Sequence, residues 1–266
     1  MSVQKSWAEL EKMHCACSLV VETLHVLAER VAPGVTTRDL DRISRERIEA
    51  AGAKPAFLGY LDYPATLCAS INEEVVHGIP GDRALEQGDI IGMDLGSIVD
   101  GYFGDSAITV GVGTVSSDAK RLMEVTERSL HAGIEMCRAG KRVGDIGHAV
   151  QTTAEAHGYS LVREFVGHGI GTQLHEEPKI PNYGPPGRRE RLVEGMCLAI
   201  EPMVNIGGAE VRVREDGWTA VTRDGSLSAH FELSVAITSD GPWILSEPNP
   251  YGARVVASSA ASAGHA

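Results

Sequence analysis

The chain has 266 residues, with 36 acidic against 24 basic side chains and a formal net charge of −12. Hydrophobic residues make up 43% and charged residues 23%, a globular composition that excludes disordered and fibrous proteins. An acidic surface repels phosphates, so nucleic acid is not expected as a partner.

Neither a membrane span nor a signal peptide is visible. The most apolar early stretch, residues 15–28, contains Glu22 and His25 and falls short of the roughly 20 apolar residues that a span needs. Glu9 and Glu11 stand where the apolar part of a signal peptide would begin. The five cysteines lack the spacing of a disulfide framework. These features predict a cytoplasmic protein with reduced thiols and no membrane contact.

The predicted elements begin with an amphipathic helix that starts at the S-x-x-E capping pattern of Ser6 and Glu9 and stops before Pro33 and Gly34. Further helices are predicted over residues 37–51, 117–139 and 143–157. Strands are predicted over residues 66–71, 89–98, 102–112, 197–200, 211–214, 218–222 and 230–238. The Ala/Ser-rich residues 251–266 carry no core pattern and are expected to form a disordered tail.

An internal repeat relates the first two helices to the second two. A shift of 106 residues gives eight identities within 29 positions, among them Gly34 with Gly140 and Asp39 with Asp145. Convergence of two amphipathic patterns is one explanation. Duplication of an α+β unit around a pseudo-two-fold axis is the other, and it would place a site between the halves.

One hairpin brings two carboxylates together. The dipeptide at 100–101, Asp-Gly, favours a two-residue turn, which puts Asp94 opposite Ala107 and on the same face as Asp105. Such a face is solvated in many amphipathic strands. Apolar neighbours on both sides indicate burial here, and two buried carboxylates need a compensating cation.

Further metal-binding residue types lie in apolar or glycine-rich surroundings. They are His168 in FVGHGIG, His175 in LHEEP, Glu201 in MCLAIEP and Glu232 in AHFELSVAIT. Each is unremarkable alone, as a loop histidine or an outward-facing glutamate. Together with the two aspartates they suit a pair of divalent ions that share carboxylates, with Mn, Fe(II) or Co better matched than a thiolate-bound structural zinc.

The chain resembles the methionine aminopeptidases in the order of five candidate ligands: Asp94, Asp105, His168, Glu201 and Glu232. The strings INEEVVHGIP, GDIIGMDLG, DGYFGDSA, GHGIGTQLHEEP, AIEPM and DGWTAVTRDGSLSAHFE are similar too, and the resemblance spans residues 6–248. The absence of a long insertion between His175 and Glu201 is typical of the type I subgroup.

The resemblance implies the pita-bread fold, an α+β duplication with a curved antiparallel sheet and helices outside it. We therefore expect one catalytic domain over residues 1–250, with halves at about 6–112 and 113–250. The implied activity is hydrolytic removal of the N-terminal methionine from nascent proteins and peptides.

The resemblance also implies the metal ligands. Asp94 would bind one of two divalent ions (Co, Mn, Fe(II) or Zn), Asp105 and Glu232 would bridge both, and His168 and Glu201 would complete the other. A hydroxide that bridges the ions would attack the scissile carbonyl. One ion would receive the free α-amine of the substrate, which explains an exopeptidase. A monovalent cation near two further residues is implied as well: Asn72 and Ser228.

Three residues are implied to carry proton transfer and substrate contacts. Glu201 would take a proton from the attacking water and pass it to the leaving amine. His77 would contact the scissile amide, and His175 would hydrogen-bond the substrate carbonyl and its developing oxyanion.

The implied methionine pocket is formed by four residues: Tyr60, Tyr63, Cys68 and Trp218. An aromatic-lined slot suits a flexible thioether. Phe57 stands where the family often has cysteine, and Leu174 where it often has phenylalanine. Both keep the wall apolar, so we expect methionine preference with an altered pocket shape.

The expected partner is the N-terminus of a peptide or nascent chain, with a transient ribosome contact, and the protein is expected to be a monomer. An Xaa-Pro aminopeptidase or dipeptidase of the same fold is an alternative. Those enzymes usually carry an extra N-terminal domain, for which a first helix near Ser6 leaves no room. A metal-free binding module of this fold is a second alternative, but such modules lack the ligands found here.

Overall fold

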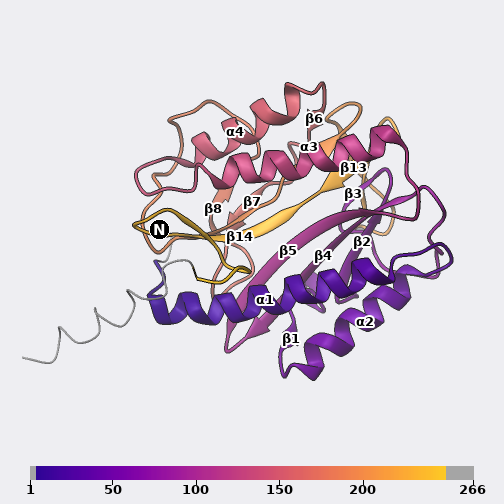
Figure 1. Ribbon diagram of the computed structural model, residues 1–266, viewed down its shortest axis with the longest axis horizontal. Coiled ribbons are helices and arrows are strands. Elements are labelled where there is room, and N and C mark those ends of the chain that lie inside the picture. Colours follow the sequence, from indigo (N-terminus) through magenta and orange to yellow (C-terminus); the bar gives the residue numbers. More distant parts are fainter. Residues whose placement is uncertain (1–3, 250–266) are drawn as a thin grey trace, which may run out of the picture.

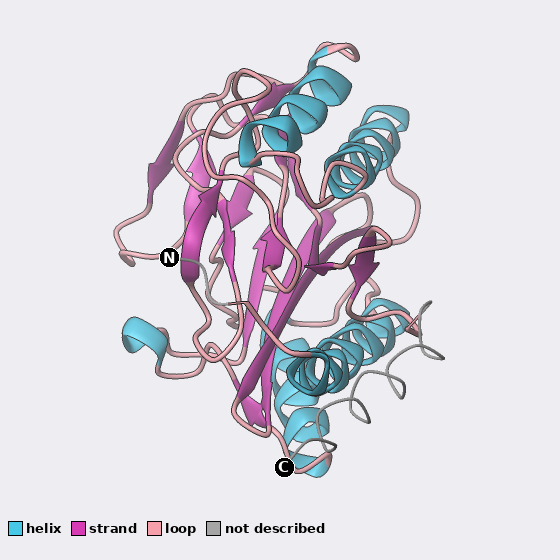
Figure 2. Ribbon diagram, turned by 90° about the vertical axis from the view of Figure 1, so that its left-hand side faces the viewer, coloured by secondary structure: helices cyan, strands magenta, loops and turns pink. Residues whose placement is uncertain are grey.

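The computed structural model describes residues 4–249, so the tail predicted over 251–266 lies outside the described residues. Four long helices flank the strands in two pairs (Figure 1). They are α1 (Trp7–Arg30), α2 (Thr37–Ala50), α3 (Ser117–Ile134) and α4 (Val143–Glu155). Figure 2 shows that all four lie along one side of the sheet. Among residues 4–249, no helix is long and apolar enough to cross a membrane.

A nine-stranded antiparallel sheet forms the centre, in the order β1-β4-β5-β14-β9-β7-β8, with β2 also beside β4 and β15 beside β14. Its strands are β1 (Lys54–Pro55), β2 (Leu67–Ile71), β4 (Ile90–Val99), β5 (Tyr102–Gly111), β7 (Gly167–Gly169), β8 (Glu176–Ile180), β9 (Cys197–Ile200), β14 (Glu232–Ile237) and β15 (Pro242–Ile244). This is the curved antiparallel sheet with outer helices that the resemblance implies.

Two three-stranded sheets complete the fold, in the orders β13-β10-β6 and β11-β12-β3. Their strands are β3 (Glu74–Val76), β6 (Ser160–Leu161), β10 (Met203–Asn205), β11 (Val211–Val213), β12 (Ala220–Thr222) and β13 (Ser228–His230). A 3₁₀ turn, η1 (Tyr60–Asp62), precedes β2.

The helices begin where the sequence predicts. Ser6 and Glu9 form the capping box of α1, with the Ser6 N–H donating to Glu9 Oε2 at 2.7 Å. α3 ends at Ile134, five residues before the predicted end, because residues 135–137 continue in tight turns that include a bond from the Cys137 N–H to the Ile134 carbonyl.

Each helix pair covers its own part of the sheet. Leu24 and Leu27 of α1 pack with Met93 and Leu95 of β4 in one buried cluster. A second cluster joins α3 and α4 to β9 and β14, with Leu130 among its members. Because side chains alternate along a strand, Asp94 between Met93 and Leu95 faces away from the helices.

The repeat is visible in the backbone. Gly34 and Gly140, 106 residues apart, have φ of +89° and +93°, a conformation that favours glycine. The N–H of Gly34 donates to the Leu85 carbonyl at 2.8 Å, and that of Gly140 to the Leu192 carbonyl at 2.9 Å. The two helix pairs therefore share their connecting turn and its anchor, as duplication predicts.

One predicted strand is divided. Residues 230–238 form the end of β13 and the whole of β14, which belong to different sheets and are separated by Phe231. The side chain of Phe231 packs in the cluster under α3 and α4. The predicted strands at 211–214 and 218–222 are also shorter, at three residues each.

Candidate metal centre and substrate pocket

A row of paired residues crosses four strands and defines the floor of the site. Cys68 pairs with Asp94, Asp94 with Ala107, and Ala107 with Glu232. Directly paired residues share a face, so Cys68, Asp94 and Glu232 point to the same side, away from α1. Asp105 pairs with Gly96, as the predicted hairpin requires, and lies diagonal to Asp94 on that side. The sequence prediction for this hairpin is confirmed pair by pair.

His168 enters from β7. Its Nε2 atom lies 3.6 Å from Glu201 Oε1 and 3.9 Å from Asp105 Oδ2, and its Nδ1 atom contacts the Gly169 carbonyl at 2.9 Å. The flanking glycines are required by close backbone packing. A Cβ at Gly167 would lie 2.3 Å from the Ala199 carbonyl oxygen.

His230 joins the cluster although the sequence did not point to it. Its Nε2 atom lies 3.9 Å from Glu201 Oε2 and 3.9 Å from Glu232 Oε2. The spacing His-x-Glu within AHFE is the signal that could have found it, because alternate residues of an extended segment share a side.

Burial dominates the electrostatics of the cluster. It raises the pKa of Asp94 to about 7 and that of Glu201 to about 8, with repulsion from Asp94 adding to the shift of Glu201. Burial, then repulsion from the neighbouring carboxylates, raises the pKa values of Asp105 and Glu232 well above the usual range. The pKa of His168 and of His230 is lowered to about 3 by the same desolvation. Four carboxylates and two neutral imidazoles therefore share one buried space.

Several atoms of this cluster have no hydrogen-bond partner. They are Asp94 Oδ1, Asp105 Oδ1, Glu232 Oε1 and His230 Nε2. Buried polar atoms without partners are costly, and clustered carboxylates with neutral imidazoles are the ligands that divalent transition metals take. The residues present thus fit a divalent metal centre, and two overlapping donor groups share Glu232.

An apolar cavity of about 210 Å³ opens beside this cluster. All six residues expected around a methionine side chain line it: Phe57, Tyr60, Tyr63, Cys68, Leu174 and Trp218. The Tyr63 and Trp218 rings pack edge to face, with 5.0 Å between their centroids. Four lining residues were not predicted: Leu61, Val76, Phe165 and Val166. Phe165 and Val166 directly precede GHGIG, so proximity in sequence to His168 could have suggested them.

The cavity ends at two further histidines. The Tyr60 hydroxyl lies 2.7 Å from His175 Nδ1. The centroids of the His175 and His168 rings are 4.3 Å apart. The His77 ring packs edge to face with Phe165, with 5.3 Å between the ring centroids. Burial lowers the pKa of His77 to about 4. All three predicted catalytic positions, at 77, 175 and 201, therefore line one cavity.

The backbone at His77 is strained, with φ of +61°, and its neighbour is anchored. The Gly78 carbonyl accepts from the Ala69 N–H at 2.8 Å and from the Tyr63 hydroxyl at 3.0 Å. The Gly78 N–H donates to Ser70 Oγ at 3.2 Å. These bonds hold the imidazole over the cavity.

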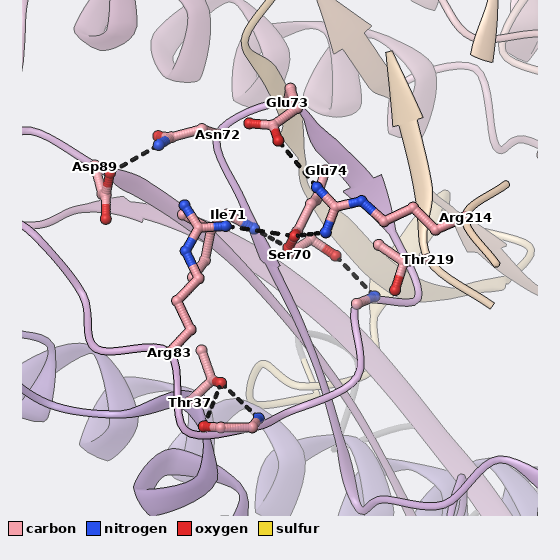
Figure 3. Close-up of polar contacts among 12 residues, drawn as sticks. Thr37, Ser70, Ile71, Asn72, Glu73, Glu74, Arg83, Asp89, Arg214 and Thr219 are labelled. Atoms are coloured by element: carbon pink, nitrogen blue, oxygen red, sulfur yellow. Dashed lines mark hydrogen bonds and ion pairs between the residues drawn. The ribbon is translucent and has the colours of Figure 1, made fainter. Parts of the chain in front are cut away.

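Figure 3 shows an ionic cluster around Glu74 of β3. Glu74 Oε1 accepts from Arg214 at 2.6 Å and from Arg83 at 3.5 Å, and Glu74 Oε2 accepts from the Ile71 N–H at 2.8 Å. Arg214 also bonds Glu73 at 3.0 Å. The cluster ties β3, which leads to His77, to the β11–β12 hairpin that carries Trp218.

A second ionic contact supports the loop that ends in His175. Lys5 Nζ lies 2.5 Å from Glu176 Oε2; the Lys5 side chain is buried, and that of Glu176 is 10% exposed. Glu176 Oε1 accepts from the N–H of Thr172 at 2.9 Å and of Gln173 at 3.3 Å. Glu176 thus bridges residues of the loop around His175 and fixes that loop to Lys5, which precedes α1.

Comparison with known proteins identifies the class. Residues 11–239 match the sequence profile of metallopeptidase family M24. The chain therefore belongs to this family of metallopeptidases, whose name implies a bound metal and agrees with the donor set described above.

Methionine aminopeptidases are among its relatives at 44–49% identity. The methionine aminopeptidase of Clostridium acetobutylicum is 49% identical over 92% of this chain and 98% of its own length. The crystal structure of the Thermotoga maritima methionine aminopeptidase superposes with a TM-score of 0.92 at 44% identity, covering 93% of this chain and 100% of that chain. An Xaa-Pro dipeptidase from Bacillus anthracis shares the fold at 19% identity and a TM-score of 0.74, and the match covers only 63% of it.

Proposed function

We propose that this chain is a methionine aminopeptidase, which hydrolyses the bond after an N-terminal methionine in peptides and nascent proteins. The observation that carries the proposal is the junction of a buried carboxylate–histidine cluster with an apolar, aromatic cavity of about 210 Å³. The cluster supplies the hydrolytic site, and the cavity has room for one unbranched apolar side chain.

The donor set supports two divalent ions. Asp94 would hold one ion, Asp105 and Glu232 would lie between the two, and His168 and Glu201 would hold the other. When bound, such ions lower the pKa of water and polarise a carbonyl oxygen. The contact from His168 Nδ1 to the Gly169 carbonyl fits this role, because metal-binding histidines commonly donate their second ring N–H to a backbone oxygen.

The chain's own groups position the substrate and move protons. Glu201, at the end of β9, accepts the proton of the attacking water and delivers it to the leaving amine. His175 donates from Nε2 to the substrate carbonyl oxygen, since its Nδ1 atom faces the Tyr60 hydroxyl. His77 contacts the scissile amide from the opposite wall. Tyr63 and Trp218 enclose the methionine side chain and exclude water from it.

The proposal also covers the domain, its cellular setting and a monovalent cation. We assign residues 1–250 to one catalytic domain of two halves, active as a cytoplasmic monomer that meets nascent chains at the ribosome. A monovalent cation near Asn72 and Ser228 is supported by one observation, the buried Ser228 Oγ without a hydrogen-bond partner.

Substrate choice tests the function. Protein supplied with Mn or Co is assayed for methionine release from Met-Gly-Met-Met and for release of the first residue from an Xaa-Pro peptide. We expect turnover of the methionyl peptide alone. No turnover of that peptide with any divalent metal would refute the proposal, and cleavage of only the Xaa-Pro peptide would favour the proline-specific alternative.

His175→Ala tests the assigned chemistry. Loss of one hydrogen-bond donor to the developing oxyanion should lower kcat by on the order of a hundredfold or more. Metal content, measured by elemental analysis, should stay near that of the unsubstituted protein. A variant that loses its metal would show that His175 is a ligand instead.

A further inference from the structure

His230 lies next to the candidate metal ligands, and the proposed function does not use it. Its side chain is 4% exposed, and its Nε2 atom has no hydrogen-bond partner. A buried ring nitrogen without a partner is destabilising. The nitrogen therefore needs a partner that the hydrogen-bonding groups around it do not supply.

The distances indicate what that partner is. His230 Nε2 lies 3.9 Å from one oxygen of Glu201 and 3.9 Å from one oxygen of Glu232. These separations are too long for hydrogen bonds. Two atoms that bind one ion at about 2.0–2.2 Å can lie up to about 4.4 Å apart, so both separations suit a shared ion.

His168 shows the same geometry. Its Nε2 atom lies 3.6 Å from Glu201 and 3.9 Å from Asp105, again without hydrogen-bond contact to either carboxylate. The two imidazoles approach different oxygens of Glu201, Oε1 from His168 and Oε2 from His230. By distance and burial the two histidines are equivalent.

The fold holds His230 firmly in this place. Its N–H donates to Thr109 Oγ1 at 3.0 Å, and its carbonyl accepts from the same hydroxyl at 2.7 Å. Thr109 lies on β5, the strand that also carries Asp105. The backbone of His230 is thus fixed to the strand that carries Asp105, which sets where its side chain starts, as preorganised metal sites require.

We propose that His230 is a sixth protein ligand, which binds through Nε2 the divalent ion held by Glu201 and Glu232. This assignment rests on the metal centre of the proposed function. A donor set with two imidazoles favours borderline ions such as Co and Zn more than Mn, which prefers oxygen.

Metal titration tests the assignment. Metal-free protein is titrated with Co(II) and with Mn(II), followed by calorimetry and by the visible absorption of cobalt. In His230→Gln the affinity for one Co(II) ion should fall at least about tenfold, and the affinity for Mn(II) should fall less. His168→Gln is the positive control, and His148→Gln, at an exposed position of α4, should behave as the unsubstituted protein. Unchanged cobalt affinity and absorption in a folded His230→Gln would overturn the proposal.

A measurement on the unsubstituted protein avoids any folding defect. Each histidine that binds Co(II) through Nε2 contributes one exchangeable, strongly shifted Nδ1 proton signal to the ¹H NMR spectrum. Two such signals are expected, and a single one would overturn the proposal. Neither the metal titration nor the NMR spectrum requires turnover. A cobalt-loaded protein that shows two Nδ1 proton signals but releases no methionine would therefore refute the proposed function and support the His230 assignment.

Discussion

At the scale of single residues, the Tyr60 hydroxyl links the apolar cavity to the proposed catalytic residue His175 through one hydrogen bond to its Nδ1 atom. We expect Tyr60→Phe to lower kcat about tenfold and to change KM less than about threefold. The ring still fills the pocket, but the imidazole loses the partner that fixes its tautomer and orientation. Steady-state kinetics with a methionyl peptide measure both constants.

Tyr102→Phe is the matched control for that substitution. The Tyr102 hydroxyl donates to Glu9 at 2.8 Å and lies outside the residues that line the cavity, so its loss should leave both constants unchanged. If Tyr60→Phe retained the full kcat, the hydrogen bond to His175 would have no catalytic role.

The sequence predicts the position of a site residue when residues close to it in the chain determine the local geometry. The Asp-Gly turn determines the register of one hairpin, so Asp94 and Asp105 could be placed on one face in advance. His230 could not be placed, because the break at Phe231 depends on packing under α3. The contact between Tyr60 and His175 joins residues 115 apart, which periodicity cannot predict.

At the scale of elements, the ion pair of Glu74 with Arg214 fastens the β11–β12 hairpin to β3. Arg214→Met should lower the free energy of unfolding by about 2 kcal/mol, because a glutamate with an 8% exposed side chain loses its shortest ionic contact. Trp218 is then held less firmly, so KM for the methionyl peptide should rise. Chemical denaturation and kinetics measure the two effects.

Arg38→Met provides the comparison. Its ion pair with Asp82 joins side chains that are 65% and 85% exposed, and solvent screens such a pair so strongly that its loss should barely change the free energy of unfolding. Equal losses in the two variants would show that the cluster around Glu74 has no special structural role.

The long elements were predictable and the short ones were not. Helices with capping residues and a 3.6-residue period were found close to their true ends. β7, β10 and β13 have three residues each, too few to show a period, and their pairing is set by distant strands.

At the scale of the whole molecule, the buried carboxylates link stability to pH and to metal. In the metal-free protein the pKa values of Asp94 and Glu201 are raised to about 7 and about 8. A group with a raised folded-state pKa stabilises the fold below its unfolded pKa of about 4, and this contribution is lost as the pH rises through the folded value. The Tm of chelator-treated protein should therefore fall between about pH 5.5 and 8.

Added metal should reverse that trend. Mn or Co at pH 8 should raise the Tm, since an ion that binds only the folded protein stabilises it by mass action. Thermal unfolding across this pH range, with and without chelator, measures the effect. Identical Tm profiles in both conditions would contradict the assigned role of the carboxylates.

The proposed ligands come from both sides of one connection: Asp94 and Asp105 lie before the link from β5 to α3, and His168, Glu201, His230 and Glu232 lie after it. An ion bound there would add a removable cross-link between two segments that also share the pairing of β5 with β14 and of β3 with β12. A chain cut within residues 112–116 would then give two fragments that associate more tightly when a divalent metal is supplied. The donor cluster thus offers a split protein whose assembly responds to a divalent metal.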